Sequence, residues 1–319
     1  MQDLVTVFGG SGFVGRQVVR ALARGDWRVR VAVRKPHLAE DLRLAGDVGQ
    51  VQLVQANIRH DGSVAAALDG ASACVNAVGQ AVERGPQTFE AVHVEGARRV
   101  AEAARKAGAR RLVQLSGIGA SETSSSKYAR ARAAGEAAVR EAFPNADILR
   151  PSVVFGANDH VTTLFARMAA MSPVVPLIGA DTRLQPVYVG DIAQAARRLL
   201  ATETIGGGLY ELGGPEVLTV RELVERICAE TQRRPGLIPL PFFAAGLMAR
   251  GGDLAAAIGL PAPITTDQVE LLREDNVATG PGLADLGVAP TSLDSVLGSY
   301  LYRYRPGGQY ADNLKRAGA

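Results

Sequence analysis

Three glycines stand three residues apart near the amino terminus, at Gly9, Gly12 and Gly15. An apolar run over residues 4–8 precedes them, and apolar residues recur at helical spacing over residues 14–22 after them. In a strand–turn–helix unit, the first glycine permits a sharp turn, the second admits a pyrophosphate, and the third lets the helix pack against the sheet. The N–H groups at the helix N-terminus would bind the phosphates. The pattern predicts dinucleotide binding, and a plain glycine-rich loop is the alternative.

The residues after the second apolar run bear on which dinucleotide binds. Arg34 and Lys35 directly follow residues 29–33, and no acidic residue occurs until Glu40. An acid at this place would bind the ribose 2′-hydroxyl of NAD, whereas an arginine suits the 2′-phosphate of NADP. The sequence therefore favours NADP(H) as the cofactor, and an ordinary solvated basic pair is the alternative.

A parallel sheet is needed to bring these residues together. Short apolar runs predict six strands, at residues 4–8, 29–33, 51–55, 73–77, 112–115 and 146–149. Helical periodicity lies between them, at residues 14–24, 63–68, 87–107 and 127–142. This alternation predicts an α/β fold with a Rossmann-like, doubly wound parallel sheet, in which ligands bind at the carboxyl ends of the strands. We expect residues 1–155 to form this NAD(P)-binding domain, with residues 184–204 returning to it.

The remaining chain is less regular. We expect residues 156–319 to form a smaller, irregular carboxyl-terminal α/β lobe for substrate or partner contacts. Its expected helices are residues 160–171, 190–200 and 220–231, and its expected short strands are residues 184–189 and 209–212. Thr219, with Glu222 three residues later, predicts a capping box. Proline and glycine are frequent from Arg233 onwards, and Tyr300–Ala319 is predicted to be an arm or tail rather than core.

The composition excludes several classes of function. Hydrophobic residues make up 47% and charged residues 21%, with a net charge of +3, as in a soluble globular protein. The sequence has no dense Lys/Arg stripe and no metal-ligand spacing, so we expect neither a nucleic acid partner nor a metal site. Cys74 and Cys228 lie in apolar runs that predict buried thiols. We expect a cytoplasmic protein, or a mature one already processed. Residues 1–3 run straight into the first strand, which leaves no room for a leader, and no apolar run approaches the roughly 18 to 20 residues of a membrane span.

Several short motifs follow the glycine turn in a recognisable order. They are residues 76–79, 93–97 and 115–116, Tyr128, and residues 149–156 and 186–193. With them, residues 4–230 resemble the extended and atypical short-chain dehydrogenase/reductase superfamily. Residues 127–130, 135–136 and 184–193 more narrowly resemble an atypical branch. This branch contains the NAD(P)-binding accessory subunit of respiratory complex I and its bacterial relatives.

The resemblance implies a catalytic tyrosine at Tyr128, with an unusual partner. Active members of the superfamily have a lysine four residues after the tyrosine, on the same face of the helix. That lysine lowers the pKa of the tyrosine, positions the nicotinamide ribose and relays a proton. Here Arg132 occupies the position, and an arginine supplies charge and hydrogen bonds but does not release its proton. Ser116 is the candidate hydroxyl partner, although it stands only 12 residues before Tyr128.

The resemblance also implies a set of cofactor contacts along the ends of the strands. The predicted cofactor-binding residues are Gly9, Ser11, Gly12, Phe13, Gly15, Arg34, Lys35, Asn57, Ile58, Ala77, Val78, Gly79, Ser116, Tyr128, Arg132, Pro151 and Val153. The cofactor site is thus complete, whereas the catalytic site departs from the active pattern at Arg132. Whether the chain is an enzyme stays open at this point.

Three functions are compatible with this pattern. The first is an NADPH-binding, catalytically weak or inactive accessory subunit of respiratory complex I, peripheral on the inner face of a respiratory membrane. The second is a stand-alone NAD(P)-dependent reductase, dehydrogenase or epimerase that acts on a small or lipid-like substrate. The third is a quinone-metabolism accessory factor. Steady NADPH turnover with a carbonyl substrate would favour the second function over the first.

Two carboxyl-terminal stretches are candidates for partner contacts. Residues 237–260 are apolar but too short and proline-broken to span a bilayer. If their side chains do not all pack inward, they leave an exposed patch; the alternative is that they close the core of the small lobe. Residues 300–319 add tyrosine and arginine, which are enriched at protein interfaces.

Overall fold

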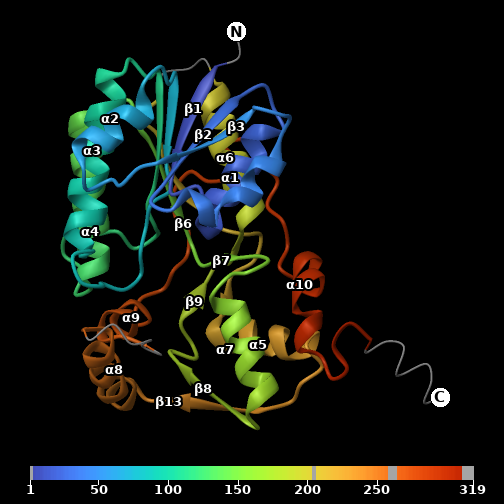
Figure 1. Ribbon diagram of the computed structural model, residues 1–319. Coiled ribbons are helices and arrows are strands. Elements are labelled where there is room, and N and C mark those ends of the chain that lie inside the picture. Colours follow the sequence, from blue (N-terminus) through green and yellow to red (C-terminus); the bar gives the residue numbers. More distant parts are fainter. Residues whose placement is uncertain (1–2, 203–205, 258–263, 311–319) are drawn as a thin grey trace.

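The computed structural model describes residues 3–202, 206–257 and 264–310. The parts of the two predicted partner stretches that fall on residues 258–263 and 311–319 lie outside these residues. Figure 1 shows a larger lobe built around a sheet, which contains the amino terminus, and a smaller lobe below it. The carboxyl ends of the sheet strands face the smaller lobe, as the course of β1 (Leu4–Phe8) from the amino terminus shows (Figure 1).

The larger lobe has a seven-stranded parallel sheet in the order β11-β6-β5-β4-β1-β2-β3. Besides β1 its strands are β2 (Arg28–Val33), β3 (Val51–Gln55), β4 (Ala73–Asn76), β5 (Arg111–Leu115), β6 (Asp147–Pro151) and β11 (Leu209–Leu212). The central strands are rich in buried β-branched residues, such as Val5, Val7 and Val31, because helices cover both faces. The predicted doubly wound fold is confirmed. The strand order reverses between β1 and β4, which is where such sheets bind ligands.

Two layers of helices cover the sheet. The helices α1 (Phe13–Ala23) and α6 (Val189–Ala201) pack on one face, in one continuous apolar core. The helices α2 (Asp61–Leu68), α3 (Glu95–Lys106) and α4 (Lys127–Ala142) pack on the other face. The expected helix over residues 87–107 instead begins with a π-helical turn, η3 (Glu90–Val94), which leads directly into α3.

The chain crosses to the smaller lobe after β6 and then returns. α6 packs along α1, and β11 pairs in parallel with β6 to become the edge strand of the sheet. Residues 209–212, which we expected as a short strand beyond the returning segment, therefore belong to the main sheet. The larger lobe is assembled from two stretches of chain that are separated by elements of the smaller one.

The smaller lobe combines short strand pairs with helices. Its elements are β7 (Val154–Phe155), α5 (Val161–Met171), β8 (Val174–Ile178), β9 (Arg183–Leu184), β10 (Val187–Tyr188), β12 (Leu218–Thr219), α7 (Val220–Glu230), β13 (Gly236–Leu240), α8 (Phe242–Ala257), α9 (Thr266–Leu271) and α10 (Asp294–Leu301). The predicted capping box of Thr219 and Glu222 is present at the start of α7. The proline- and glycine-rich stretch after Arg233 nevertheless forms β13 and α8.

The prediction that the chain is an arm or tail from Tyr300 onwards is wrong at its start. Tyr300 and Leu301 end α10, and both are buried in the core of the smaller lobe. The Tyr300 hydroxyl lies 3.0 Å from a carboxylate oxygen of Asp159 and 2.8 Å from the Thr162 hydroxyl. This buried polar cluster fixes α10 against the start of α5, so deletion from Tyr300 would remove core side chains.

The described part of the apolar stretch 237–260, which forms most of β13 and all of α8, serves both roles that we considered for it. On α8, Ala245 and Ala249 are buried against α9. Phe243, Leu247 and Leu254 are 81%, 72% and 69% exposed and lie on one side of the same helix. We call these three residues the α8 stripe.

Within the described residues, no helix has the length and apolarity that crossing a bilayer requires. Cys74 and Cys228 are buried free thiols, as predicted.

Candidate functional site

The turn between β1 and α1 depends on its glycines. Gly9 has a φ of +73°, and a Cβ there would lie 2.9 Å from the backbone of Ala77 and Val78. A Cβ at Gly15 would lie 2.2 Å from the Gly9 carbonyl oxygen, which is far inside van der Waals contact. A Cβ at Gly12 would approach only that carbonyl oxygen, at 3.2 Å. The first and third glycines therefore allow the backbone to pack, and the second leaves room beside the turn.

The N-terminus of α1 is available to an anion. Among the described residues, no side chain caps this helix, and its first turn contains no acid. Ser11 and Gly12 are exposed at this end of the helix. Arg16 supports the turn from within the helix, because its Nε donates to the Ser11 carbonyl at 2.9 Å. Unpaired N–H groups and the helix dipole make this end suitable for phosphate.

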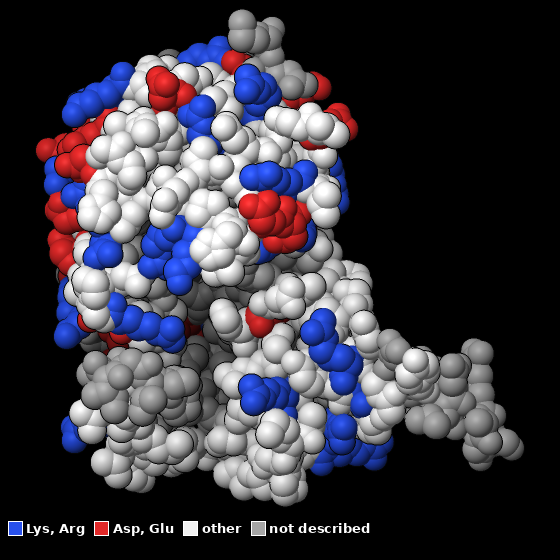
Figure 2. Space-filling view, in the orientation of Figure 1, with Lys and Arg blue, Asp and Glu red and all other residues white. Residues whose placement is uncertain are grey.

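A cavity of about 210 Å³ opens beside this turn, at the carboxyl ends of β1 to β4. Nine of the predicted cofactor-binding residues line it: Gly9, Ser11, Gly12, Arg34, Asn57, Ile58, Ala77, Val78 and Gly79. Seven residues absent from the prediction also line it: Ala32, Val33, Ala56, Arg59, Gln80, Gln87 and Val92. Figure 2 shows a hollow between the two lobes, with Lys and Arg side chains on the larger lobe near its rim. The glycine cradle, the free helix end and this cavity together fit a dinucleotide.

The remaining predicted residues lie outside the cavity lining. Phe13 and Gly15 lie in α1 behind the turn, and Lys35 is exposed beyond β2. Ser116, Tyr128, Arg132, Pro151 and Val153 lie on the β5 and β6 side of the sheet. Gly79 joins the two groups, because a Cβ on it would lie 2.8 Å from Arg132 Nη2. The site thus divides into the cavity and an adjoining region around Tyr128.

Arg34 stands at the rim of the cavity, just after β2. Its side chain is exposed, and its Nη1 donates to Gln87 Oε1. Gln55 Nε2 donates to the Arg34 backbone carbonyl at 3.4 Å, at the end of the neighbouring β3. Replacing a solvent-exposed hydrogen bond by another costs little free energy. The guanidinium can therefore turn from Gln87 to a phosphate that enters the cavity.

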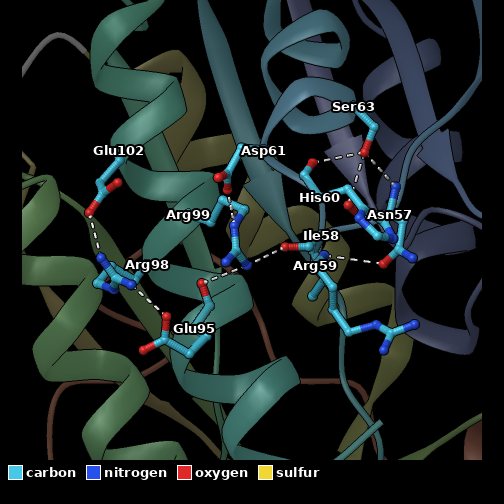
Figure 3. Close-up of polar contacts among 10 residues, drawn as sticks. All are labelled: Asn57, Ile58, Arg59, His60, Asp61, Ser63, Glu95, Arg98, Arg99 and Glu102. Atoms are coloured by element: carbon cyan, nitrogen blue, oxygen red, sulfur yellow. Dashed lines mark hydrogen bonds and ion pairs between the residues drawn. The ribbon is translucent and has the colours of Figure 1, made fainter. Parts of the chain in front are cut away.

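The loop after β3 is shaped by local hydrogen bonds (Figure 3). The Ser63 hydroxyl donates to the Asn57 carbonyl at 3.0 Å and accepts from the Asn57 N–H at 3.1 Å. The Asn57 side chain accepts from the Arg59 N–H at 3.1 Å, which closes a tight turn. Asn57 is therefore occupied with the loop itself, and its backbone and Ile58 form the cavity wall.

Helix α3 holds the loop after β3 in place through Arg99. Arg99 Nη1 donates to the Ile58 carbonyl at 2.9 Å, and Arg99 also pairs with Asp61 at the start of α2 (Figure 3). A Cβ on Gly96 would lie 2.6 Å from Ile58 Cδ1, so glycine lets the helix approach. The cavity wall at Ile58 is thus held by a side chain about 40 residues away in the sequence.

Tyr128 and Arg132 form a pair one helical turn apart on α4. Arg132 Nε donates to the Tyr128 hydroxyl at 3.0 Å, and Arg132 Nη1 donates to the Leu115 carbonyl at 2.9 Å. The guanidinium carbon lies 5.1 Å from the centroid of the tyrosine ring. Arg132 thus holds the phenol oxygen in place. It leaves the phenol proton free to be donated elsewhere.

An aromatic cluster surrounds the tyrosine on its other side. The rings of Phe89 and His93 lie 5.6 Å and 5.4 Å from the Tyr128 ring, both edge-on. His93 is 3% exposed, and its Nε2 lies 2.9 Å from the Gln80 carbonyl. Burial and the nearby Arg132 charge lower the pKa of His93 to about 3. His93 is therefore neutral near pH 7 and donates from Nε2 to the loop that lines the cavity.

Ser116 is engaged in a buried ion-pair network. Its hydroxyl donates to the Glu136 carboxylate, which also accepts from Arg150 Nε at 2.9 Å and from Arg150 Nη2 at 2.7 Å. Ser116 and Glu136 are 6% and 7% exposed. The serine hydroxyl in this structure therefore connects β5, β6 and α4 and does not point at the Tyr128 hydroxyl as an available donor.

Pro151 and Val153 contribute mainly through their backbone. The Pro151 carbonyl accepts from the Ile118 N–H at 3.0 Å, and the Val153 carbonyl accepts from the Val187 N–H at 2.9 Å. These bonds fix the segment after β6 between the two lobes. Both side chains are half-buried.

Sequence reasoning predicted Ala77, Val78 and Gly79 after β4 but missed the cavity residues farther along the same segment. Gln80 and Gln87 line the cavity and bond to each other through Gln80 Nε2 and the Gln87 carbonyl, at 2.7 Å. A glutamine in a loop has no distinctive spacing. Arg59 is placed by its bond to the Pro86 carbonyl at 3.1 Å, which is equally invisible in the sequence. The one available signal was that this segment follows β4 at the reversal of strand order.

Comparison with protein families identifies the group to which this architecture belongs. Residues 5–213 match the NAD dependent epimerase/dehydratase family. The chain belongs to this family. The matched region runs from the first strand of the sheet to its edge strand β11 and includes the whole cavity.

Two curated family relatives cover most of the chain. A mitochondrial protein of Arabidopsis thaliana, named NADH dehydrogenase (ubiquinone) 1 alpha subcomplex subunit 9, is 34% identical over 96% of this chain and 79% of its own length. A protein of Caulobacter vibrioides named ceramide reductase is 35% identical over 75% of this chain and 74% of its own length. Among solved structures, the Citrobacter sp. triphenylmethane reductase complexed with NADP(H) has a TM-score of 0.71 at 19% identity, covering 92% and 98% of the two chains. This last similarity supports the fold.

A nicotinamide dinucleotide bound here would supply a hydride for transfer or accept one. In this chain, the residues at hand can bind phosphates at α1, enclose the nucleotide at β2 to β4 and present a phenol proton from Tyr128. Arg132 orients that phenol and supplies positive charge. Because its own proton is not released near neutral pH, it cannot return a proton to the phenol after transfer.

Proposed function

We propose that this protein is an NADPH-binding accessory subunit of a respiratory complex I, with little or no catalytic turnover of its own. The observation that carries the proposal is the contrast between the cofactor cavity and the catalytic pair within one site. The glycine turn and its cavity are well formed, whereas the lysine position is filled by Arg132, bonded to both Tyr128 and the Leu115 carbonyl. A site of this kind can retain a nucleotide but lacks a side chain that relays protons.

The similarity over nearly the whole chain to a mitochondrial alpha subcomplex subunit 9 supports the assembly with complex I subunits. The α8 stripe is the surface that we assign to this contact, because it leaves three large apolar side chains exposed at the end of the smaller lobe. We place the protein at the inner face of a respiratory membrane, as a peripheral component. Bound NADPH would order the larger lobe. The nucleotide would thereby stabilise the subunit and would not supply electrons.

The preference for NADPH over NADH rests on Arg34. It lies at the rim of the cavity after β2, where a 2′-phosphate would be bound.

The decisive experiment is isolation of the tagged full chain from its native membrane in mild detergent. We expect NADP(H) in the denatured eluate at near one per chain, together with complex I subunits at a constant ratio through gel filtration. A chain that elutes alone, or one that carries no nucleotide, contradicts the proposal.

Arg132→Lys tests the weak-turnover part separately. We expect no NADPH oxidation above background by the wild type with a panel of aldehydes, ketones and quinones, because Arg132 does not relay a proton. The lysine variant should gain measurable oxidation, followed by absorbance of the reduced nicotinamide. Brisk wild-type turnover with an ordinary pH profile would show that Arg132 does not limit the chemistry.

A second candidate function is NADPH-dependent reduction of a lipid ketone related to ceramide. It is favoured by the Caulobacter vibrioides ceramide reductase, which is 35% identical over 242 residues. In that reaction a hydride from NADPH and the phenol proton of Tyr128 would convert C=O to CH–OH. Incubation of the pure protein with NADPH and a keto-ceramide, followed by mass spectrometry of the lipid, distinguishes the two functions. Formation of the alcohol at many turnovers favours this candidate over the accessory subunit.

A further inference from the structure

A carboxylate of the smaller lobe closes the N-terminus of α4. Asp267 Oδ1 accepts from the Lys127 N–H at 2.6 Å, and Asp267 Oδ2 accepts from the Tyr128 N–H at 3.3 Å and from the Ser126 hydroxyl at 2.9 Å. Ser126 is also the N-cap of α4, and its hydroxyl oxygen accepts from the Ala129 N–H at 3.1 Å. The N–H groups of the first turn are therefore satisfied largely by one residue about 140 positions away.

The Asp267 carboxylate contacts Tyr128 itself, the residue that carries the candidate catalytic phenol. The Tyr128 backbone is bonded to Asp267, and its side chain is bonded to Arg132 one turn later. A negative charge at the N-terminus of α4 also complements the helix dipole. Loss of this contact would free the first turn of α4 and with it the phenol, whereas, among the described residues, none of α9 lines the cavity.

Asp267 is itself held by its own lobe. It lies in the first turn of α9, where Thr265 and Gln268 form a capping box. α9 packs on α8 through Val269, against Ala245 and Ala249. The Asp253 carboxylate of α8 also accepts from the Thr266 N–H at 3.1 Å. Helix α8, α9 and the start of α4 are thus joined by consecutive direct contacts.

We propose that Asp267 is a positioning residue that sets the geometry of Tyr128 and Arg132 from the smaller lobe. Through it, the position of α8 is coupled to nucleotide affinity on the nicotinamide side of the site. This inference rests on the proposed nucleotide binding and adds to it a specific connection between the partner surface and the site. By reciprocity, a bound NADPH that contacts Tyr128 would favour the observed placement of α8 and α9.

The test compares a whole and a partial ligand. In the proposed binding mode NADPH would reach both regions of the site, whereas adenosine 2′,5′-bisphosphate would reach only the cavity. In the full-length Asp267→Ala variant we expect the Kd for NADPH to rise about tenfold and the Kd for the bisphosphate to change less than twofold. Asp267→Asn, which keeps one acceptor oxygen, should give an intermediate rise in the Kd for NADPH.

A matched acid on the same lobe controls for general destabilisation. Asp275 accepts from the Arg183 N–H at 2.8 Å and forms an ion pair with the Arg183 guanidinium, so Asp275→Asn should leave both affinities within twofold of wild type. Hydrogen exchange at residues 127–129 supplies a second readout. We expect NADPH to slow exchange there in the wild type and to have little effect in Asp267→Ala.

The outcomes separate this inference from the proposed function. A wild type that binds neither ligand refutes nucleotide binding itself, and this inference with it. A wild type that binds both, with equal weakening of both in Asp267→Ala or with no weakening of either, overturns only the positioning role. Selective loss of NADPH affinity together with unprotected residues 127–129 supports it.

Discussion

Replacement of Arg34 by alanine isolates the contribution of one guanidinium to cofactor choice. A charge-assisted hydrogen bond to a phosphate stabilises a complex by about 1.5–3 kcal/mol. Arg34 must first release Gln87 Oε1, an exposed contact that offsets about 0.5–1 kcal/mol of this gain. The net loss in Arg34→Ala is therefore about 1–2 kcal/mol, which raises the Kd for NADPH roughly 5- to 30-fold.

Titration calorimetry with NADPH and NADH on both proteins measures this effect. NADH lacks the 2′-phosphate, so its Kd should change less than twofold in Arg34→Ala. The wild-type preference for NADPH should also weaken as ionic strength rises, because the contact is exposed to solvent.

Lys35→Ala is the matched control, since Lys35 is adjacent in sequence but does not line the cavity. We expect it to change both affinities less than twofold. Equal wild-type affinities for the two nucleotides would refute the reasoning, as would a selectivity that Lys35→Ala removes and Arg34→Ala leaves intact.

Gly15→Ala places a Cβ 2.2 Å from the Gly9 carbonyl oxygen, so urea unfolding should show a loss of about 2–3 kcal/mol and calorimetry no nucleotide binding; wild-type values would contradict the packing role. Burial, with a smaller contribution from Arg132, lowers the pKa of His93 from 6.5 to about 3. The unfolded chain then binds the proton more tightly than the folded chain, so the free energy of unfolding should fall by about 2 kcal/mol from pH 7 to pH 5. Urea titrations at the two pH values should show that His93→Gln lacks this decrease. Phe243→Ser with Leu247→Ser should reduce co-sedimentation with respiratory membranes severalfold while the Kd for NADPH changes less than twofold; undiminished sedimentation would reject the α8 stripe as the contact surface.

The larger lobe was largely predictable because its signals are local. Runs of buried β-branched residues indicate the strands, and the spacing of Gly9, Gly12 and Gly15 indicates a turn of the kind found after β1. One exception, besides the return of β11 to the sheet, is the start of the helix after β4. There a Cβ on Gly135 of α4 would lie 2.0 Å from the His93 carbonyl oxygen, so close packing between helices accompanies the π turn. Residues 87–94 contain no local signal of that contact.

Long-range hydrogen bonds account for the parts that sequence reasoning missed. The region around Tyr300 has the composition of a surface arm, yet Asp159, 2% exposed and 141 residues earlier, bonds its hydroxyl in the core. Ser116 has the type and place of an active-site hydroxyl, yet Glu136 and Arg150 form a buried network with it. In both cases the deciding partner is distant in sequence, and its approach is determined by packing.

The position of β11 at the edge of the sheet has a consequence for synthesis on the ribosome. β6 is complete at Pro151, but the strand that covers its edge ends only at Leu212, 61 residues later. At about 5–20 residues per second, the emerging chain exposes the unpaired edge of β6 for roughly 3–12 s. An open parallel edge is a template for pairing with another nascent chain. A chaperone that covers this edge during the interval would prevent such pairing.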